Sequence, residues 1–150
     1  MTLTIAQESP LTEDASGLLA GSEAALREAY DITACSTYDA SQLAAATIQF
    51  FVARQSGRPV GCVALCLEDG YAEIKRLITV KEEHGQGVAK ALMAHLEDTA
   101  QASGVSRVLL ETGSKLTAAV ALYDALGYGR CGPFGDYEQG ETTIFMQKGL

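Results

Sequence analysis

Basic residues and long apolar runs are both scarce in this chain of 150 residues. It carries 11 lysines and arginines against 19 aspartates and glutamates, for a formal net charge of −8. Nucleic acids and anionic membranes are bound by cationic faces, so this balance argues against both as the main partner. It leaves room for a cationic substrate such as an amine.

Membrane and targeting signals are also missing from the sequence. No apolar run approaches the ~20 residues that a bilayer span requires. Residues 1–8 lack the basic and apolar parts of a signal peptide. These absences predict a soluble, cytoplasmic protein.

Cysteine and histidine are too few and too scattered to form a recognisable metal site. The four cysteines are Cys35, Cys62, Cys66 and Cys131; no pair has Cys-x-x-Cys spacing, and neither histidine lies at a zinc-like offset. Cys62 and Cys66 lie in an apolar strand pattern, which indicates small core residues. We therefore expect no metal, and free thiols rather than disulfides.

The composition is that of a globular chain, with 47% hydrophobic and 20% charged residues, and the length fits one domain over residues 1–150. Three apolar strand patterns, at residues 47–54, 59–67 and 71–80, are separated by short turn signals rich in glycine, serine and aspartate. Strands joined by such turns predict an antiparallel meander.

The apolar period then changes from that of a strand to that of a helix. Residues 87–103 carry a helical stripe and residues 107–112 form a buried-type strand, which predicts a parallel crossover. A second amphipathic helix over residues 116–126 and two final strands follow.

The first third of the chain is less regular. Residues 3–6 fit a short strand. The helical pattern that follows is interrupted by Gly17 and Gly21, so two short helices fit as well as one. Residues 31–46 predict a loop with a short helix.

A glycine turn, His84-Gly85-Gln86-Gly87-Val88-Ala89, stands between a strand pattern and a helical pattern. Glycines let backbone approach a ligand closely, and the unpaired N–H groups and dipole of a helix start favour an anion. A loop that only turns a corner explains these six residues equally well when they are taken alone. A dinucleotide fingerprint would need a third glycine where Lys90 stands, and no P-loop is present.

Four motifs together resemble the Gcn5-related N-acetyltransferase (GNAT) superfamily in order and spacing. They are Glu73-Ile74-Lys75-Arg76, the glycine turn, Leu110-Glu111-Thr112-Gly113, and Leu122-Tyr123-Asp124-Ala125-Leu126-Gly127-Tyr128. The family signature begins with Arg or Gln, where this chain has His84. With Phe134-Gly135-Asp136-Tyr137 added, the set is similar to a bacterial subgroup of small-molecule acyltransferases.

The resemblance implies an α/β, layered GNAT fold. We expect a mixed, mostly antiparallel sheet of six or seven strands, with a central parallel pair and helices on both faces. It also implies an N-acetyltransferase that moves an acetyl group from acetyl-CoA to a primary amine of a small molecule or peptide, by direct attack in a ternary complex. Many relatives pair, so the resemblance admits a homodimer.

The resemblance places CoA between the strands at residues 71–80 and 107–112, which are expected to separate beyond a bulge. The backbone of the first strand would bind pantetheine and the glycine turn would bind pyrophosphate. For Lys90 the alternative is a solvated surface lysine. The candidate cofactor-binding residues are Leu77, Ile78, Thr79, His84, Gly85, Gln86, Gly87, Val88, Ala89 and Lys90.

Tyr123 and Glu73 are the candidate catalytic residues by the same resemblance. A phenol, with a pKa of about 10, can give a proton to the leaving CoA thiolate without being charged at rest. A core aromatic is the alternative for Tyr123. Glu73, or less favourably Glu111, would take the proton of the amine, and pairing with a nearby lysine or arginine is the alternative for either.

A non-catalytic acyl-CoA-binding or sensing module of the same fold remains the alternative function. Tyr123 argues against it, because binding alone needs no proton donor. Residues 30–43 and 134–139 are expected to select the acceptor, but they carry no spacing that names it.

Overall fold

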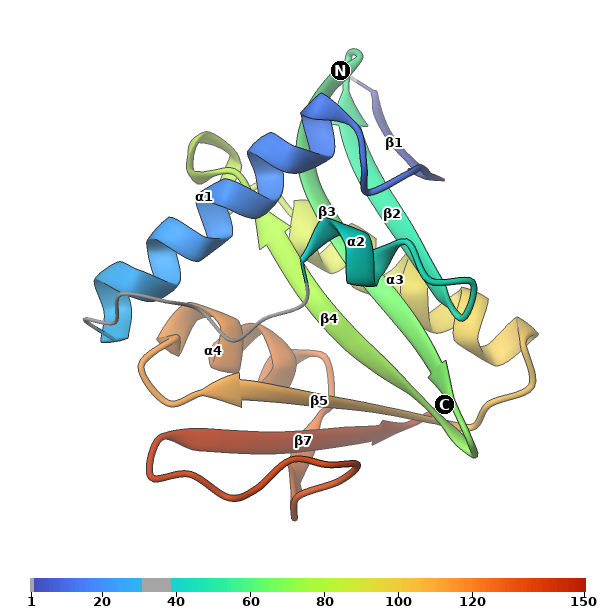
Figure 1. Cartoon of the computed structure of the whole chain (residues 1–150), viewed down its shortest axis with the longest axis vertical. Helices are drawn as coiled ribbons and strands as arrows, with labels where there is room; N and C mark the ends of the chain where they lie inside the picture. Colours follow the sequence, from blue (N-terminus) through green and yellow to red (C-terminus); the bar gives the residue numbers. More distant parts are fainter. Residues whose placement is uncertain (1, 31–38) are drawn as a thin grey trace.

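The computed structural model describes residues 2–30 and 39–150, with the backbone alone for residues 25–30. Within them, seven strands form one sheet in the order β1-β2-β3-β4-β5-β7-β6 (Figure 1). The β4–β5 pair is parallel and the other pairs are antiparallel, which confirms the predicted mixed sheet. The strands are β1 (Leu3–Gln7), β2 (Ile48–Gln55), β3 (Arg58–Glu68), β4 (Tyr71–Thr79), β5 (Arg107–Gly113), β6 (Gly129–Cys131) and β7 (Thr143–Gly149).

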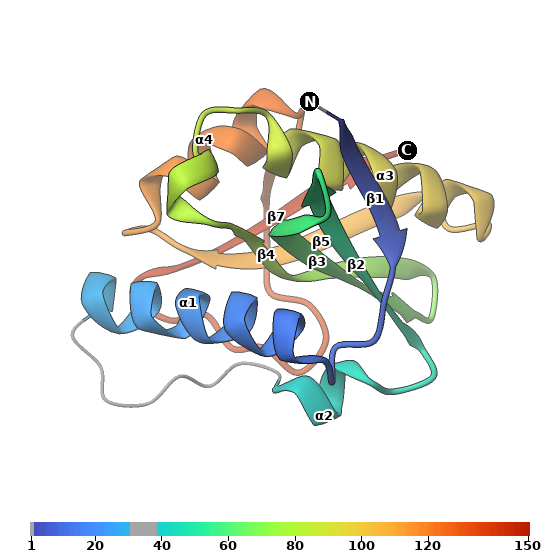
Figure 2. The same cartoon turned by 90° about the horizontal axis from the view of Figure 1, so that it is seen from above.

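Helices cover both faces of the sheet, as predicted (Figure 2). Helices α1 (Glu13–Tyr30) and α2 (Ala40–Leu43) lie on one face, and α3 (Val88–Ala102) and α4 (Thr117–Ala125) lie on the other. A single 3-10 turn, η1 (Lys81–Glu83), joins β4 to the glycine turn.

Two apolar clusters hold these layers together. The cluster on the α1 face joins Leu18, Leu19 and Leu43 to Phe50 and other residues of β2 and β3. The cluster on the α3 face is larger and joins the buried stripe of α3 to the opposite side of the sheet. That stripe consists of Val88, Leu92, Met93, Leu96 and Ala100.

The N-terminal helix is one helix rather than two. Gly17 and Gly21 are exposed, whereas Leu18 and Leu19 are buried against the sheet. Each glycine costs about 1 kcal/mol relative to alanine. Burial of each leucine contributes about 1.5–3 kcal/mol, so packing outweighs the local penalty.

A bulge in β4 separates the two central strands. Cys62 pairs with Ile78 and Ala64 with Lys75, so β4 contains one residue more than β3 across this interval. Arg76 takes a φ of 56° there, a backbone conformation that is uncommon for a residue with a side chain. In the described chain, β4 and β5 pair at two positions, Ala72 with Val108 and Glu73 with Leu109. Both the predicted bulge and the predicted separation are confirmed.

The loop predicted at residues 31–46 is described only in part, because residues 31–38 and therefore Cys35 lie outside the described residues. Its short helix is α2. The Asp39 side chain accepts from the N–H of Gln42 at 2.9 Å, and the Gln42 side chain accepts from the N–H of Asp39 at 2.9 Å. Such a reciprocal capping box explains why so short a helix forms.

Two other features of the described chain bear on the expectations from sequence. Cys62, Cys66 and Cys131 are free thiols. The described helices include none with both the length and the hydropathy of a membrane span.

Candidate active site

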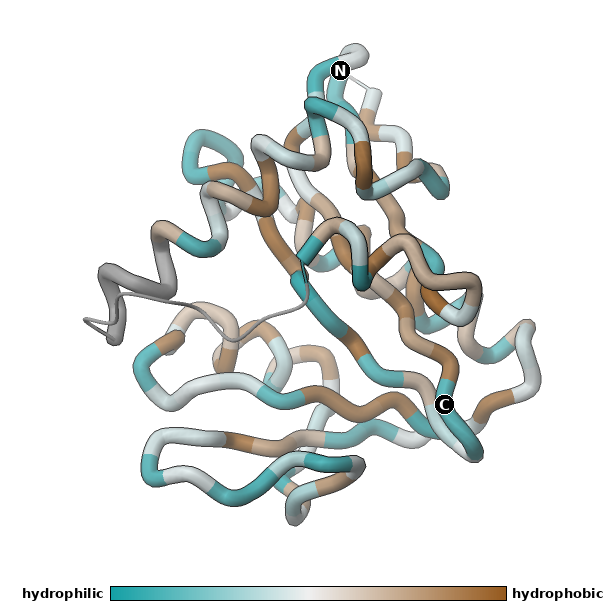
Figure 3. The backbone as a smooth tube through the Cα atoms, viewed as in Figure 1, coloured by the Kyte–Doolittle hydropathy of each residue, from teal (hydrophilic) through white to brown (hydrophobic). Residues whose placement is uncertain are grey.

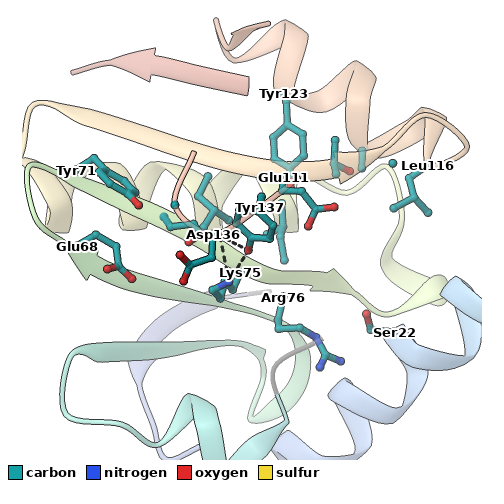
Figure 4. Close-up of a pocket in the computed structure, with 17 residues that line it drawn as sticks. Ser22, Glu68, Tyr71, Lys75, Arg76, Glu111, Leu116, Tyr123, Asp136 and Tyr137 are labelled. Carbon is teal, nitrogen blue, oxygen red and sulfur yellow. Dashed lines mark hydrogen bonds and ion pairs between the residues drawn. The ribbon is translucent and has the colours of Figure 1, made fainter. Parts of the chain in front are cut away.

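A cleft of about 570 Å³ opens where β4 and β5 separate. Its walls come mainly from β4, β5, α4 and the loop between β6 and β7, and Ser22 of α1 and Glu68 of β3 also line it (Figure 4). Figure 3 shows hydrophilic segments within β4, where charged residues of the cleft interrupt an apolar strand.

The cleft takes side chains from both faces of the sheet. Lys75 pairs with Ala64, which belongs to the cluster on the α1 face, and Glu73 lies two residues away on that same face. Tyr123 belongs to the cluster on the α3 face. All three line the cleft, so the cavity brings together groups that an intact β4–β5 ladder would keep apart.

Glu73 lies at the centre of a polar network and is 5% exposed. Tyr137 donates its hydroxyl proton to Glu73 Oε2 at 2.5 Å, and Lys75 Nζ lies 3.0 Å from the same oxygen. Lys75 also donates to the Tyr137 hydroxyl oxygen at 2.7 Å. Glu73 is therefore paired with Lys75, which is the alternative that the sequence had left open.

The protonation states in this network follow from its contacts. Burial works against the charge of Lys75, but its hydrogen bond with Tyr137 and the charge of Glu73 raise its pKa above the ordinary value. Burial and the hydrogen bond to Glu73 raise the pKa of the Tyr137 phenol. Near neutral pH the network therefore holds an ammonium group and a neutral phenol.

Tyr123 reaches the cleft from α4 and is 6% exposed. Its ring packs edge-to-face against Tyr128, with ring centroids 5.8 Å apart. The Tyr128 hydroxyl donates to Glu97 at 2.8 Å, and Lys148 donates to the same carboxylate at 2.9 Å. Burial raises the pKa of the Tyr123 phenol, so the side chain stays neutral. Tyr123 is therefore both a packed core aromatic and a residue that lines the cleft.

The rest of the cleft wall is mixed in charge. Glu111 is exposed, yet the cleft desolvates it enough to raise the pKa of its carboxyl group. Arg76 Nη2 donates to the carbonyl oxygen of Leu19 at 3.0 Å, and Nη1 lies 3.7 Å from Glu23 Oε1. These contacts join the bulge of β4 to α1.

The glycine turn lies beyond β4 and fits an anion. Gly87 caps α3 with a φ of 84°, and no side chain caps this helix start. Side-chain atoms added at Gly85 or Gly87 would meet open space, so both backbones face outward. His84 Nε2 lies 3.0 Å from the carbonyl oxygen of Thr79, which ties the turn to the end of β4.

The structure brings together only some of the predicted site residues. Tyr123, Glu73 and Leu77 line the cleft, whereas the other candidates lie past its walls toward the glycine turn. The side chains of Leu77 and Ile78 pack on opposite apolar clusters, as expected of core residues. Val88 is buried, and Lys90 is exposed.

Sequence reasoning missed the contact between Tyr137 and Glu73. Both residues stand in motifs that carried the resemblance, so their identity was visible although their contact was not. No cluster of three or more His, Cys, Asp or Glu side chains suited to a metal ion occurs in the described part of the chain.

Comparison with known proteins identifies the class that this fold and cleft define. The model of the acetyltransferase (GNAT) family matches residues 18–128. The chain belongs to this family and is an acetyl-CoA-dependent N-acetyltransferase.

Relatives and solved structures agree with this assignment. The chain is 37% identical to an IAA acetyltransferase of Azospirillum brasilense over 150 residues, which cover 99% of this chain and 98% of the relative. It is 36% identical to the uncharacterized N-acetyltransferase YsnE of Bacillus subtilis over 106 residues, which cover 69% and 70% of the two chains.

Two solved structures share the fold over nearly the whole chain. A provisionally identified acyl-CoA N-acyltransferase of Klebsiella pneumoniae has a TM-score of 0.83 at 30% identity, covering 99% of this chain and 97% of the other. The PaiA N-acetyltransferase of Thermoplasma acidophilum, solved in complex with coenzyme A, has a TM-score of 0.79 at 17% identity and covers 100% of both chains.

Proposed function

We propose that this enzyme transfers the acetyl group of acetyl-CoA to a primary amine of a small molecule or peptide, by direct attack in a ternary complex. One observation carries the proposal. The cleft holds a buried neutral phenol, Tyr123, and a buried carboxylate, Glu73, contributed from opposite faces of the sheet. One group can give a proton and the other can accept one, which is what transfer from a thioester to an amine requires.

Acetyl-CoA would lie along β4 with its pyrophosphate at the glycine turn. The β4–β5 ladder ends at Glu73, so the β5-facing edge of β4 beyond it can form hydrogen bonds with the pantetheine amides as a strand would. The uncapped start of α3 and the outward backbones of Gly85 and Gly87 fit the pyrophosphate. The His84 contact with Thr79 would hold the turn against the strand end.

In this proposal the two catalytic candidates act on different protons. Glu73 takes a proton from the amine nitrogen as that nitrogen attacks the thioester carbonyl carbon. The carbon–sulfur bond breaks, and Tyr123 gives its hydroxyl proton to the departing thiolate. The acetylated amine and free CoA leave, Tyr123 regains a proton and Glu73 releases one. Each positioned proton transfer contributes about 10²–10⁴-fold to the rate.

Release of the CoA thiol across a panel of primary amines tests the proposal. Initial rates measured at several concentrations of both substrates should give intersecting reciprocal plots, as a ternary complex requires. Parallel plots or an acetylated form of the enzyme would contradict direct attack. Tight acetyl-CoA binding with hydrolysis as the sole turnover would favour a binding module instead.

A further inference from the structure

The polar network at Glu73 joins two distant parts of the chain. Glu73 and Lys75 lie on β4, whereas Tyr137 lies 64 residues beyond Glu73, in the loop between β6 and β7. Figure 4 shows the Lys75 and Tyr137 side chains close together in the cleft, and both contact Glu73 Oε2, Tyr137 through a hydrogen bond and Lys75 through an ion pair. The Glu-Ile-Lys-Arg motif and the Phe-Gly-Asp-Tyr motif therefore meet at a single carboxylate.

The loop that carries Tyr137 is fixed by aromatic packing. The Phe134 ring lies 5.2 Å from the Tyr137 ring, 5.6 Å from Phe145 and 5.9 Å from Tyr71, measured between centroids. Gly135 takes a φ of 58°, and a side chain there would meet the Tyr71 hydroxyl at 3.5 Å. The Tyr137 ring is therefore held by packing on Phe134 and Phe145, in addition to the contacts of its hydroxyl group.

Ring packing does not explain why a phenol stands at this position, because a phenylalanine would keep the aromatic contacts. In the described chain both partners of Glu73 use Oε2. Two bonds to one oxygen fix the carboxylate and leave Oε1 as the oxygen that can face the cleft.

We propose that Tyr137 is a positioning residue of the acetyl transfer, which together with Lys75 holds Oε2 of Glu73 and directs Oε1 toward the amine of the acceptor. This inference rests on the proposed function and extends it. The amine proton moves to Oε1, while Tyr137 and Lys75 keep their own protons. The loop between β6 and β7 thereby connects the acceptor side of the cleft to the base.

Tyr137→Phe tests the role, since it removes one hydroxyl and retains the ring. Because this variant loses a hydrogen bond to a charged group, we expect kcat to fall about 10-fold or more, with the KM for acetyl-CoA unchanged. The acidic limb of the kcat–pH profile should move to higher pH by about one unit, because a carboxylate that has lost a donor is protonated more readily. The other titratable groups of the cleft stay in place in this variant; they are Glu68, Tyr71, Lys75, Arg76, Glu111, Tyr123 and Asp136.

Tyr71→Phe is the matched control. It removes a phenol from the same aromatic cluster but no contact with Oε2, so the acidic limb should stay where the unsubstituted enzyme has it. Lys75→Gln removes the other partner of Oε2 and should move the limb in the same direction as Tyr137→Phe. A Tyr137→Phe enzyme with an unchanged kcat and an unchanged acidic limb would overturn the inference.

Thermal unfolding tests the network without any turnover. The effects of Tyr137→Phe and Glu73→Gln on the Tm should be non-additive, because the two groups share a bond. Additive effects would overturn the inference. If the unsubstituted enzyme releases no thiol with any amine, the proposed function fails. The comparison of the single and double variants by thermal unfolding still decides whether Tyr137 holds Glu73.

Discussion

Tyr123 is the single side chain on which the chemistry can be tested most directly. Tyr123→Phe keeps the ring packed on Tyr128 but removes the proton that the thiolate would take. We expect kcat to fall about 100-fold, the lower end of a general-acid contribution, with little change in the Kd for acetyl-CoA. Steady-state kinetics and calorimetry measure the two quantities separately. An unchanged kcat would remove Tyr123 from the mechanism.

The buried thiols on β3 predict how stability depends on pH. Burial raises the pKa of Cys62 and of Cys66 from 9.0 to about 12. Below pH 9 both thiols are neutral in the folded and unfolded chain. Between about pH 9 and 12 only the unfolded chain loses these protons, so the folded state is progressively destabilised.

Each thiol should lower the free energy of unfolding by up to about 1.4 kcal/mol per pH unit in that window. Urea unfolding between pH 7.5 and 10.5 measures this slope. A Cys62→Ala/Cys66→Ala variant should show a shallower decline above pH 9. Parallel pH curves for the two proteins would contradict the assignment of the slope to these thiols.

Individual side chains were predictable where a motif defines them and unpredictable where a distant contact does. Tyr123 and Glu73 follow from their motifs, and the structure places both in one cleft. The bond from Tyr137 to Glu73 spans 64 residues, and no local periodicity encodes the position of a loop above a strand. The sequence offered pairing of Glu73 with a nearby lysine or arginine, but it could not decide between this pairing and a free carboxylate.

The close contact of α3 with the sheet depends on Gly61 in β3. A Cβ at this position would lie 2.7 Å from the carbonyl oxygen of Ile78 and 3.0 Å from Val88. Gly61→Ala must therefore shift either β4 or the start of α3, at a cost of about 1–3 kcal/mol in unfolding free energy. Because this shift moves the glycine turn relative to β4, acetyl-CoA affinity should fall as well.

Gly129→Ala is the control for that change, since a Cβ at Gly129 meets nothing within 4 Å and its φ is not positive. It should leave both the urea midpoint and the affinity nearly unchanged. Equal effects of the two substitutions would show that the close contact of Gly61 with α3 does not determine the stability or the acetyl-CoA affinity.

Helices and strands were predicted best where a single buried face gives the apolar residues a regular spacing. The α3 stripe follows the helical period, and α3 spans Val88–Ala102. The glycines of α1 left one helix or two equally open from the sequence, and the packing of Leu18 and Leu19 against the sheet stabilises a single helix. The bulge at Arg76 was expected only through the resemblance, since no residue there demands a positive φ.

The order β2-β3-β4-β5 could be inferred because short turns and one helical crossover allow few arrangements, whereas no pattern predicted the places of β1, β6 and β7. Local patterns cannot predict the weakly paired boundary between β4 and β5, which we call the seam of the sheet. In the described chain, strands β1–β4 and strands β5–β7 pair across it at two positions only. A ligand that lies in this seam would contact both halves, so its binding should stabilise the whole fold.

Thermal and urea unfolding with acetyl-CoA test this coupling. At 100 times its Kd, acetyl-CoA should raise the free energy of unfolding by about 2.7 kcal/mol.

Gly87→Ala places a side chain at a φ of 84°, which costs roughly 1–2 kcal/mol without ligand. The added methyl group points into the open space where the pyrophosphate would lie. Gly104→Ala imposes the same backbone penalty at the other end of α3, with a φ of 90° and open space around it. Both variants should lose stability alone, but only Gly87→Ala should also lose most of the stabilisation by acetyl-CoA. Equal ligand effects in the two variants would mean that the start of α3 does not hold the pyrophosphate.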